Sequence, residues 1–196
     1  MRKVVDIHAV KSPNPLAMKF ELPALLLTNE AYSFHSKEEA GRSPLALKLF
    51  GFDYVARVFI TKNFVTVSKK DEFPSWDEVM IDARIVIKKH LEAGEPLFDF
   101  DSTQVQEKPK LDVQAQGISD LIEEAILPAT WQDGGQITFE SFNEGVVKVK
   151  MAGACVACPF APRTLKHGVE VLLQRSFPEV TAVTSDNVDW SETQQE

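Results

Sequence analysis

The sequence predicts an α+β protein of two small α/β-layered domains, β-β-α-β-β-α over residues 1–97 and α-β-β-α-β over residues 113–196. Three observations support this class. Pairs of strand-like runs are separated by two or three turn residues, which is typical of hairpins. Segments with apolar residues at helical spacing follow each hairpin. A polar stretch without periodicity, residues 98–112, separates the two units and is predicted to be a linker.

The first domain is expected to begin with two strands. The first covers Val4–Val10 and ends at Ser12-Pro13-Asn14-Pro15, where two prolines make a stiff turn. Apolar and polar residues then alternate over Met18–Leu22, which predicts the second strand. Leu25–Leu27 is a candidate extension of the same sheet.

A short helix and a hairpin follow. Ser43 and Pro44 are typical of an N-cap and a first helical position, and Gly51 is expected to end this helix. Val55–Thr61 and Phe64–Lys69 read as two strands joined by a tight turn.

A longer helix closes the first domain. Ser75 is the expected N-cap and Gly94 the expected end. Its apolar face is formed by residues at helical spacing: Trp76, Val79, Met80, Ala83, Val86, Ile87 and Leu91.

The second domain is expected to open with a helix over about Gly117–Leu127, which Pro128 should kink or restart. Ile137–Phe142 and Val146–Met151 are predicted strands, joined by a turn at 143–145. After a loop at 153–159, one further helix and a final strand complete the domain. That helix has an apolar face made of Leu165, Val169, Leu172 and Leu173, and the strand covers Val180–Thr184. A short polar tail ends the chain.

Composition and charge exclude several classes of protein. The formal net charge is −8, and residues 111–196 carry all of it, with 13 acidic and 5 basic side chains. The basic excess that nucleic-acid binding requires is missing, so no nucleic-acid partner is expected. The apolar runs are short and broken by charges, so we expect no membrane span and no membrane partner.

The compartment is expected to be a reducing one. No apolar stretch of signal-peptide length follows Arg2 and Lys3. We expect the bacterial cytoplasm, with the mitochondrial matrix after processing as the alternative. The chain has only two cysteines, three positions apart, and this pattern indicates chemistry rather than disulfide stapling.

Cys155 and Cys158 are the candidate metal ligands. They lie between a predicted strand and a predicted helix, so the helix dipole and free backbone N–H groups are expected to lower their pKa. We expect the pair to be exposed at an edge of the domain. Three basic side chains follow on the helix: Arg163, Lys166 and His167. They could favour thiolates or a negatively charged cluster, although an ordinary solvated helix face explains them equally well.

The pair supports three kinds of chemistry. A thiol–disulfide oxidoreductase is possible, although the hairpin-linked sheet differs from the βαβ unit of thioredoxin-like proteins. A structural zinc site needs four ligands, and His167 is the only histidine in this domain, so zinc in a single chain is disfavoured. A 4Fe–4S cluster needs four thiolates, which two chains related by a two-fold axis supply together.

The motifs of the second domain resemble the NifU-like, or Nfu-type, iron–sulfur scaffold domain over residues 118–184. The similar positions are Ile126-Leu127-Pro128, Asp133-Gly134-Gly135, Gly145, Gly153-x-Cys155-x-x-Cys158, Thr164-Leu165-Lys166-x-Gly168-Val169-Glu170, Pro178-Glu179-Val180 and Val183. The first 97 residues resemble the N-terminal domain of the same family. The similar positions there are Ser12-Pro13-Asn14-Pro15, Lys19-Phe20, Arg42-Ser43-Pro44-Leu45-Ala46, Phe64-Val65-Thr66-Val67 and Trp76.

This resemblance implies a non-enzymatic scaffold or carrier. Such proteins bind a 4Fe–4S cluster between two protomers, with a 2Fe–2S cluster as the alternative, and transfer it to apo-proteins. Cys155 and Cys158 would be the cluster ligands, with a homodimer forming when the cluster is bound. The implied partners are apo iron–sulfur clients and the upstream cluster assembly machinery. The N-terminal domain, which has no cysteine, would assist in dimerisation or client recognition.

Overall fold

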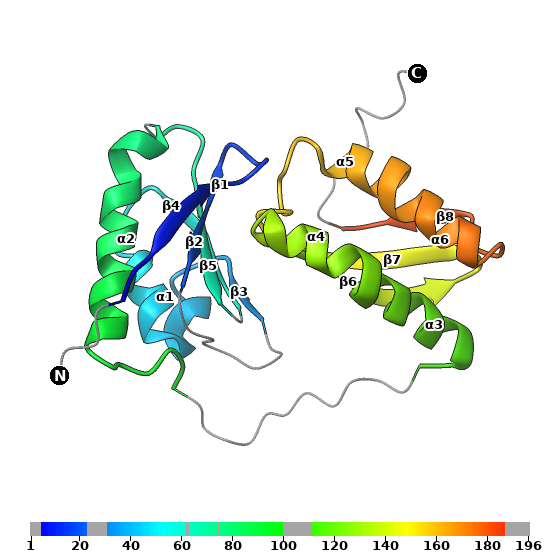
Figure 1. Cartoon of the computed structure of the whole chain (residues 1–196), viewed down its shortest axis with the longest axis horizontal. Helices are drawn as coiled ribbons and strands as arrows, with labels where there is room; N and C mark the ends of the chain where they lie inside the picture. Colours follow the sequence, from blue (N-terminus) through cyan, green and yellow to red (C-terminus); the bar gives the residue numbers. More distant parts are fainter. Residues whose placement is uncertain (1–4, 23–30, 62, 74, 100–110, 187–196) are drawn as a thin grey trace. The chain divides into compact units, whose positions relative to one another are not determined.

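The computed structural model describes residues 5–22, 31–61, 63–73, 75–99 and 111–186 (Figure 1). The chain divides into two compact units, residues 1–106 and 107–196. Three predicted features lie wholly or mainly outside the described residues: the extension at Leu25–Leu27, most of the linker, and the polar tail. None of the helices that the structure describes is both long and apolar enough to cross a bilayer.

The first unit is built on a five-stranded antiparallel sheet in the order β1-β2-β5-β4-β3. The strands are β1 (His8–Lys11), β2 (Ala17–Glu21), β3 (Tyr32–Phe34), β4 (Val55–Ile60) and β5 (Phe64–Lys69). The predicted hairpin of β4 and β5 is confirmed, with Val58 opposite Val67. The first strand begins at His8 rather than Val4, and β3 was not predicted.

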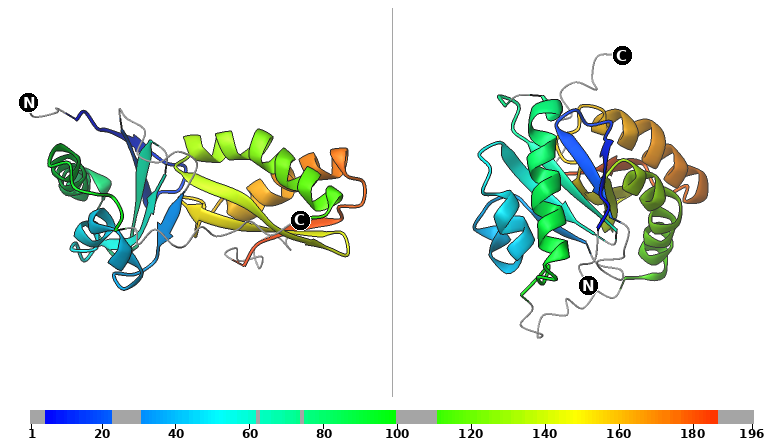
Figure 2. Two further views of the ribbon diagram at one scale, coloured as in Figure 1. Left: turned by 90° about the horizontal axis from the view of Figure 1, so that it is seen from below. Right: turned by 60° about the vertical axis from the view of Figure 1, so that its left-hand side comes forward.

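Three helical segments complete the first unit: η1 (Glu39–Arg42), α1 (Pro44–Leu49) and α2 (Trp76–Glu92). Ser43 caps α1 as predicted, because its Oγ accepts the N–H of Ala46 at 3.2 Å. Ser75 precedes α2 without a side-chain cap hydrogen bond. Both α1 and α2 cover one face of the sheet (Figure 2), where alternate strand residues pack against them.

The compact part of the first unit extends beyond residue 97. The ring of Phe98, the first residue of the predicted linker, is buried in the core at 4.4 Å from the ring of Tyr32, centroid to centroid. The N–H of Asp99 donates to the carbonyl of Arg42 at 2.9 Å. The linker prediction therefore begins slightly too early, because a single apolar side chain in a polar stretch gives no periodic signal.

The second unit opens with one continuous helix made of α3 (Val113–Leu121), a π-helical turn η2 (Ile122–Ile126) and α4 (Leu127–Gln132). Asp112 caps it by accepting the N–H of Ala115 at 2.7 Å. Pro128 lies in the first turn of α4 and neither ends nor restarts the helix. Proline lacks an N–H and crowds the turn that precedes it. The π turn directly before α4 is wider than an α turn, so the backbone hydrogen bonds next to Pro128 follow a different pattern.

A three-stranded sheet follows, with β6 (Gly135–Asn143) antiparallel to β7 (Val146–Gly153) and β7 parallel to β8 (Ala182–Thr184). The predicted hairpin is confirmed, and its turn uses positive φ angles at Glu144 (48°) and Gly145 (82°). Between β7 and β8 the chain forms α5 (Ala161–Arg163), a π-helical segment η3 (Thr164–Glu170) and α6 (Val171–Ser176).

Both helical segments of the second unit lie on the same face of its sheet (Figure 2). The core between these two layers is aliphatic: Ile118, Ile122, Ile137, Val147, Val149, Met151, Val156, Ala161, Leu165, Val169, Leu173, Val180 and Val183. The observed order α-β-β-α-β matches the prediction. The loop from β7 to α5 is thereby fixed at one end of a packed two-layer unit.

Candidate metal centre

The two cysteines lie in the loop 154–160, between β7 and α5. The chain turns sharply there, with φ of 61° at Gly153 and 54° at Ala157. Backbone hydrogen bonds hold the turn: the N–H of Cys155 donates to Ala152 O at 3.3 Å, and the N–H of Ala161 donates to Cys158 O at 3.0 Å. The loop is therefore a fixed structure with a definite place for each sulfur.

Both cysteines are free thiols and both are half-buried. Their side chains pack against the aliphatic core of the second unit. The expectation of a solvent-exposed pair at an edge of the domain is therefore only partly right. The sulfurs lie at the edge of the core, with apolar atoms on one side.

Backbone amides donate hydrogen bonds to both sulfurs. The N–H of Gln136 donates to Cys155, and the N–H groups of Phe160 and Ala161 donate to Cys158. Hydrogen bonds of this kind favour a negatively charged sulfur over a neutral thiol. Their donors come from two segments, the start of β6 and the start of α5.

The protonation of the free thiols differs from the prediction. The pKa of Cys155 is raised from 9.0 to about 12, chiefly by burial and also by the nearby Cys158 and Asp133. Burial also raises the pKa of Cys158, in spite of the two N–H groups that it accepts. The sequence argument considered the helix start alone, whereas desolvation by the core outweighs the donated hydrogen bonds.

Gly135 is a part of the site that the sequence argument did not identify. A Cβ atom at this position would lie 2.4 Å from Cys155 Sγ and 2.7 Å from the Cys155 backbone nitrogen. Only a glycine allows this close approach. The consecutive glycines 134 and 135, which belong to the motif Asp133-Gly134-Gly135, were the available signal.

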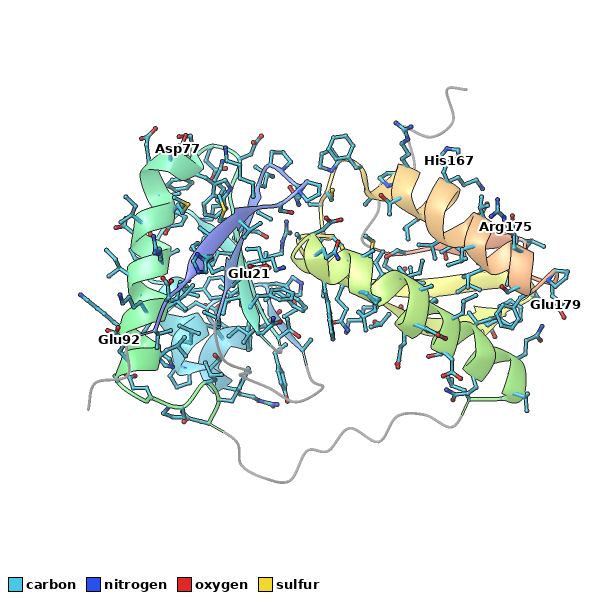
Figure 3. All side chains as sticks on the ribbon, viewed as in Figure 1. Glu21, Asp77, Glu92, His167, Arg175 and Glu179 are labelled. Atoms are coloured by element: carbon cyan, nitrogen blue, oxygen red, sulfur yellow. The ribbon has the colours of Figure 1, made fainter. Side chains whose placement is uncertain are left out.

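In the described part of the chain, no contact joins the basic residues of the following helix to either sulfur. Lys166 Nζ pairs with Glu170 Oε1 at 2.9 Å, and Arg163 is exposed. His167 lies on the exposed side of η3 (Figure 3). The interpretation of these residues as a solvated helix face is favoured.

One chain does not complete a metal site among the residues that the structure describes. No group of three His, Cys, Asp or Glu side chains is arranged there to hold a metal ion. The whole sequence holds two cysteines, and both are in this loop. A cluster with four thiolate ligands would therefore need two more from a second molecule.

Comparison with known proteins matches both units of the chain to domains of one family. Residues 7–94 match the family model described as "Scaffold protein Nfu/NifU N terminal", and residues 118–184 match the "NifU-like domain". The chain belongs to the Nfu/NifU scaffold family. The predicted Nfu-type organisation, with one domain of each kind, is confirmed.

Several curated members of the Nfu/NifU family are similar over nearly the whole chain. The human protein named "NFU1 iron-sulfur cluster scaffold homolog, mitochondrial" is 32% identical over 90% of this chain and 70% of its own length. "NifU-like protein 5, mitochondrial" of Arabidopsis thaliana is 32% identical over 94% of this chain and 69% of its own. The Drosophila willistoni NFU1 homolog is 35% identical over 93% of this chain, which spans 64% of that protein.

One solved structure of a NifU-like protein also matches. It is a solution structure from Saccharomyces cerevisiae, 20% identical, with a TM-score of 0.44 over 49% of this chain and 86% of that chain. The three Nfu relatives above are named as mitochondrial proteins. They give no support to the expectation of a bacterial cytoplasmic location.

Proposed function

We propose that this Nfu-type scaffold binds a 4Fe–4S cluster between two protomers through Cys155 and Cys158 and transfers it to apo-proteins. The observation that carries the proposal is the structure of the loop 154–160, where backbone N–H groups donate to both sulfurs of the only cysteine pair in the chain. The relatives named as iron–sulfur cluster scaffolds support the same cargo.

The residues present suit a cluster as cargo. A bound cluster leaves its thiolate ligands with negative charge, and N–H groups aimed at sulfur stabilise that charge. Gly135 leaves room for Cys155 Sγ at the start of β6. Four thiolates are needed and one chain has two, so a second copy of the loop supplies the others.

Transfer would proceed by exchange of thiolates at iron. A client cysteine gives up its proton and forms a new bond to iron, while the bond from iron to Cys155 or Cys158 breaks. The released thiolate takes up a proton, which its raised pKa favours. Iron and sulfide keep their oxidation states, so no oxidant or reductant is needed.

The same thiol pKa values speak against the thiol–disulfide oxidoreductase alternative. Such enzymes need a thiolate near neutral pH, and the microenvironment lowers the pKa of their attacking cysteine. Burial has the opposite effect on Cys155 here. The chain is therefore proposed to act as a carrier and not as an enzyme, with apo iron–sulfur clients downstream and the cluster assembly machinery upstream. The names of the relatives favour the mitochondrial alternative for its compartment.

Anaerobic reconstitution with iron and sulfide tests this proposal. The expected product is a dimer in native mass spectrometry with four irons and four sulfides for every two chains, and with charge-transfer absorption of a 4Fe–4S cluster. Cys155→Ser and Cys158→Ser should each abolish both the cluster and the dimer.

Val171→Ser is the matched control, because it introduces the same hydroxyl at an exposed position of α6. It should bind cluster as the wild type does. A wild-type protein that stays monomeric, binds no iron and reduces disulfides would overturn the proposal.

A further inference from the structure

The surface around Cys158 is apolar. Ala157, Pro159 and Phe160, which we call the loop tip, are all exposed. The Phe160 side chain is 56% exposed, and it is the one aromatic residue among the exposed large apolar side chains of the described ranges. An exposed aromatic ring beside a functional group is typical of a contact surface.

Hydrogen bonds fix the position of the Phe160 backbone in the loop. Its N–H donates to the Cys158 sulfur. Its carbonyl accepts hydrogen bonds from both the backbone N–H and the side-chain hydroxyl of Thr164, each at 3.0 Å. The next residue, Ala161, is buried in the core. These contacts hold the Phe160 backbone beside the Cys158 sulfur, where its ring is exposed.

The distribution of charge in the second unit indicates which partner the loop tip can contact. Residues 153–162 contain no charged side chain, although residues 111–196 as a whole carry a net charge of −8. Two copies of so acidic a domain repel each other wherever acidic faces meet. The uncharged loop is where they can approach without that repulsion, whereas a basic partner would be attracted to the acidic faces instead.

We infer that Phe160 contacts its own copy across the two-fold axis and forms the apolar rim that keeps water from the shared cluster. This inference rests on the proposed function, because four sulfurs on one cluster bring two loop tips together. Phe160 is two residues from Cys158 and must enter the same interface. An apolar rim restricts access of solvent and chelators to a metal site and so slows its loss.

Phe160→Ser in the full-length chain tests the inference after anaerobic reconstitution. The measurements are the dissociation constant of the loaded dimer, from analytical ultracentrifugation, and the rate of iron loss to a chelator. Both should rise by about tenfold, since two rings are lost from each interface.

Val113→Ser is the matched control. Val113 is 92% exposed. It is the first residue of the continuous helix 113–132. The other end of this helix leads to Gly134, whose carbonyl accepts the N–H of Ala154 in the loop. Twenty helical residues place it about 30 Å away from the loop end of the unit. This variant should match the wild type in both measurements.

Different results contradict the proposed function and the inference about Phe160. A wild-type protein that does not load or dimerise contradicts the proposed function, before any variant is compared. A loaded Phe160→Ser dimer with wild-type values in both measurements overturns the inference. Slower transfer to an apo-ferredoxin, with both dimer measurements unchanged, also overturns the inference, because Phe160 would then contact clients and not its own copy. If Phe160→Ser cannot be loaded, Phe160→Ala decides, because it removes the ring without adding a hydroxyl, and wild-type values of both measurements in that variant overturn the inference.

Discussion

Gly135 lies directly against Cys155: a Cβ atom at position 135 would come within 2.4 Å of the Cys155 sulfur. The contact joins the start of β6 to the loop after β7. The N–H of the next residue, Gln136, donates to the same sulfur. One ligand of the proposed cluster is therefore positioned by a strand that is 20 residues away in the sequence.

Gly135→Ala should displace Cys155. The added methyl group would also lie 2.7 Å from the Cys155 backbone nitrogen and 3.0 Å from Ala152 O, so the backbone as well as the side chain must move. We expect a loss of about 1–3 kcal/mol in the free energy of unfolding, which is typical of overpacking. Cluster content after reconstitution should fall severalfold, measured as iron per chain.

Gly168→Ala is the control for this substitution. Gly168 lies inside η3, and a Cβ there would meet no atom within 4 Å. This variant should gain about 0.5–1 kcal/mol in urea unfolding, because alanine loses less backbone entropy in a helix. Equal iron content in the Gly135→Ala variant and the wild type would contradict the prediction.

The thiol of Cys155 in the metal-free protein should react slowly. Its pKa of about 12, against an ordinary value of 9.0, leaves about a thousandfold less thiolate near pH 8. Alkylation by iodoacetamide, followed residue by residue with mass spectrometry, should be slow in the folded protein and fast in urea. The rate should still rise with pH above about pH 10. A plateau at about pH 10 would show that the thiol pKa is not raised.

Glu170 should contribute to stability, and Lys166 should contribute little. The buried carboxylate of Glu170 accepts the N–H of Val183 at 2.9 Å, which ties β8 to η3. Glu170→Ala leaves that buried N–H without a partner and should cost about 1–3 kcal/mol in urea unfolding. Lys166→Ala removes a half-exposed ion pair and should cost about 0–1 kcal/mol. Neither change should alter the iron content. A large loss of cluster in Lys166→Ala would show instead that Lys166 favours the negatively charged cluster.

The first unit should lose stability in mild acid through His90. The Pro96 carbonyl can only accept, so His90 Nε2 donates to it at 3.1 Å, and Nδ1 accepts from Lys48 Nζ at 3.4 Å. Burial and the Lys48 charge lower the pKa of His90. Below about pH 6.5 the unfolded chain therefore binds a proton that the folded unit does not, and stability falls as pH decreases.

The measurement for His90 is the thermal unfolding temperature of the first unit between about pH 7.5 and pH 5.5. The wild type should show a falling midpoint with decreasing pH. His90→Gln should be less stable at pH 7.5 but should show a flatter slope. An unchanged slope in the variant would assign the pH dependence to other groups.

The regular elements could be predicted because their patterns are long or carry turn residues. The hairpins, the Ser43 cap and the apolar face of α2 are all of this kind. Strand β3 could not be predicted, because three residues contain no periodic signal. Pro128 leaves the helix continuous, and the π turn directly before it had no signal in the residue pattern.

The sequence by itself determined that the chain has two cysteines three positions apart, since the number and spacing of thiols are covalent properties. Only the tertiary structure decided their surroundings. The pairing of β6 with β7 brings Gly135 to Cys155, and the aliphatic core raises the pKa of both thiols against the effect of the donated N–H groups. Burial and close approach depend on residues far apart in the chain, so the local motif could not reveal them.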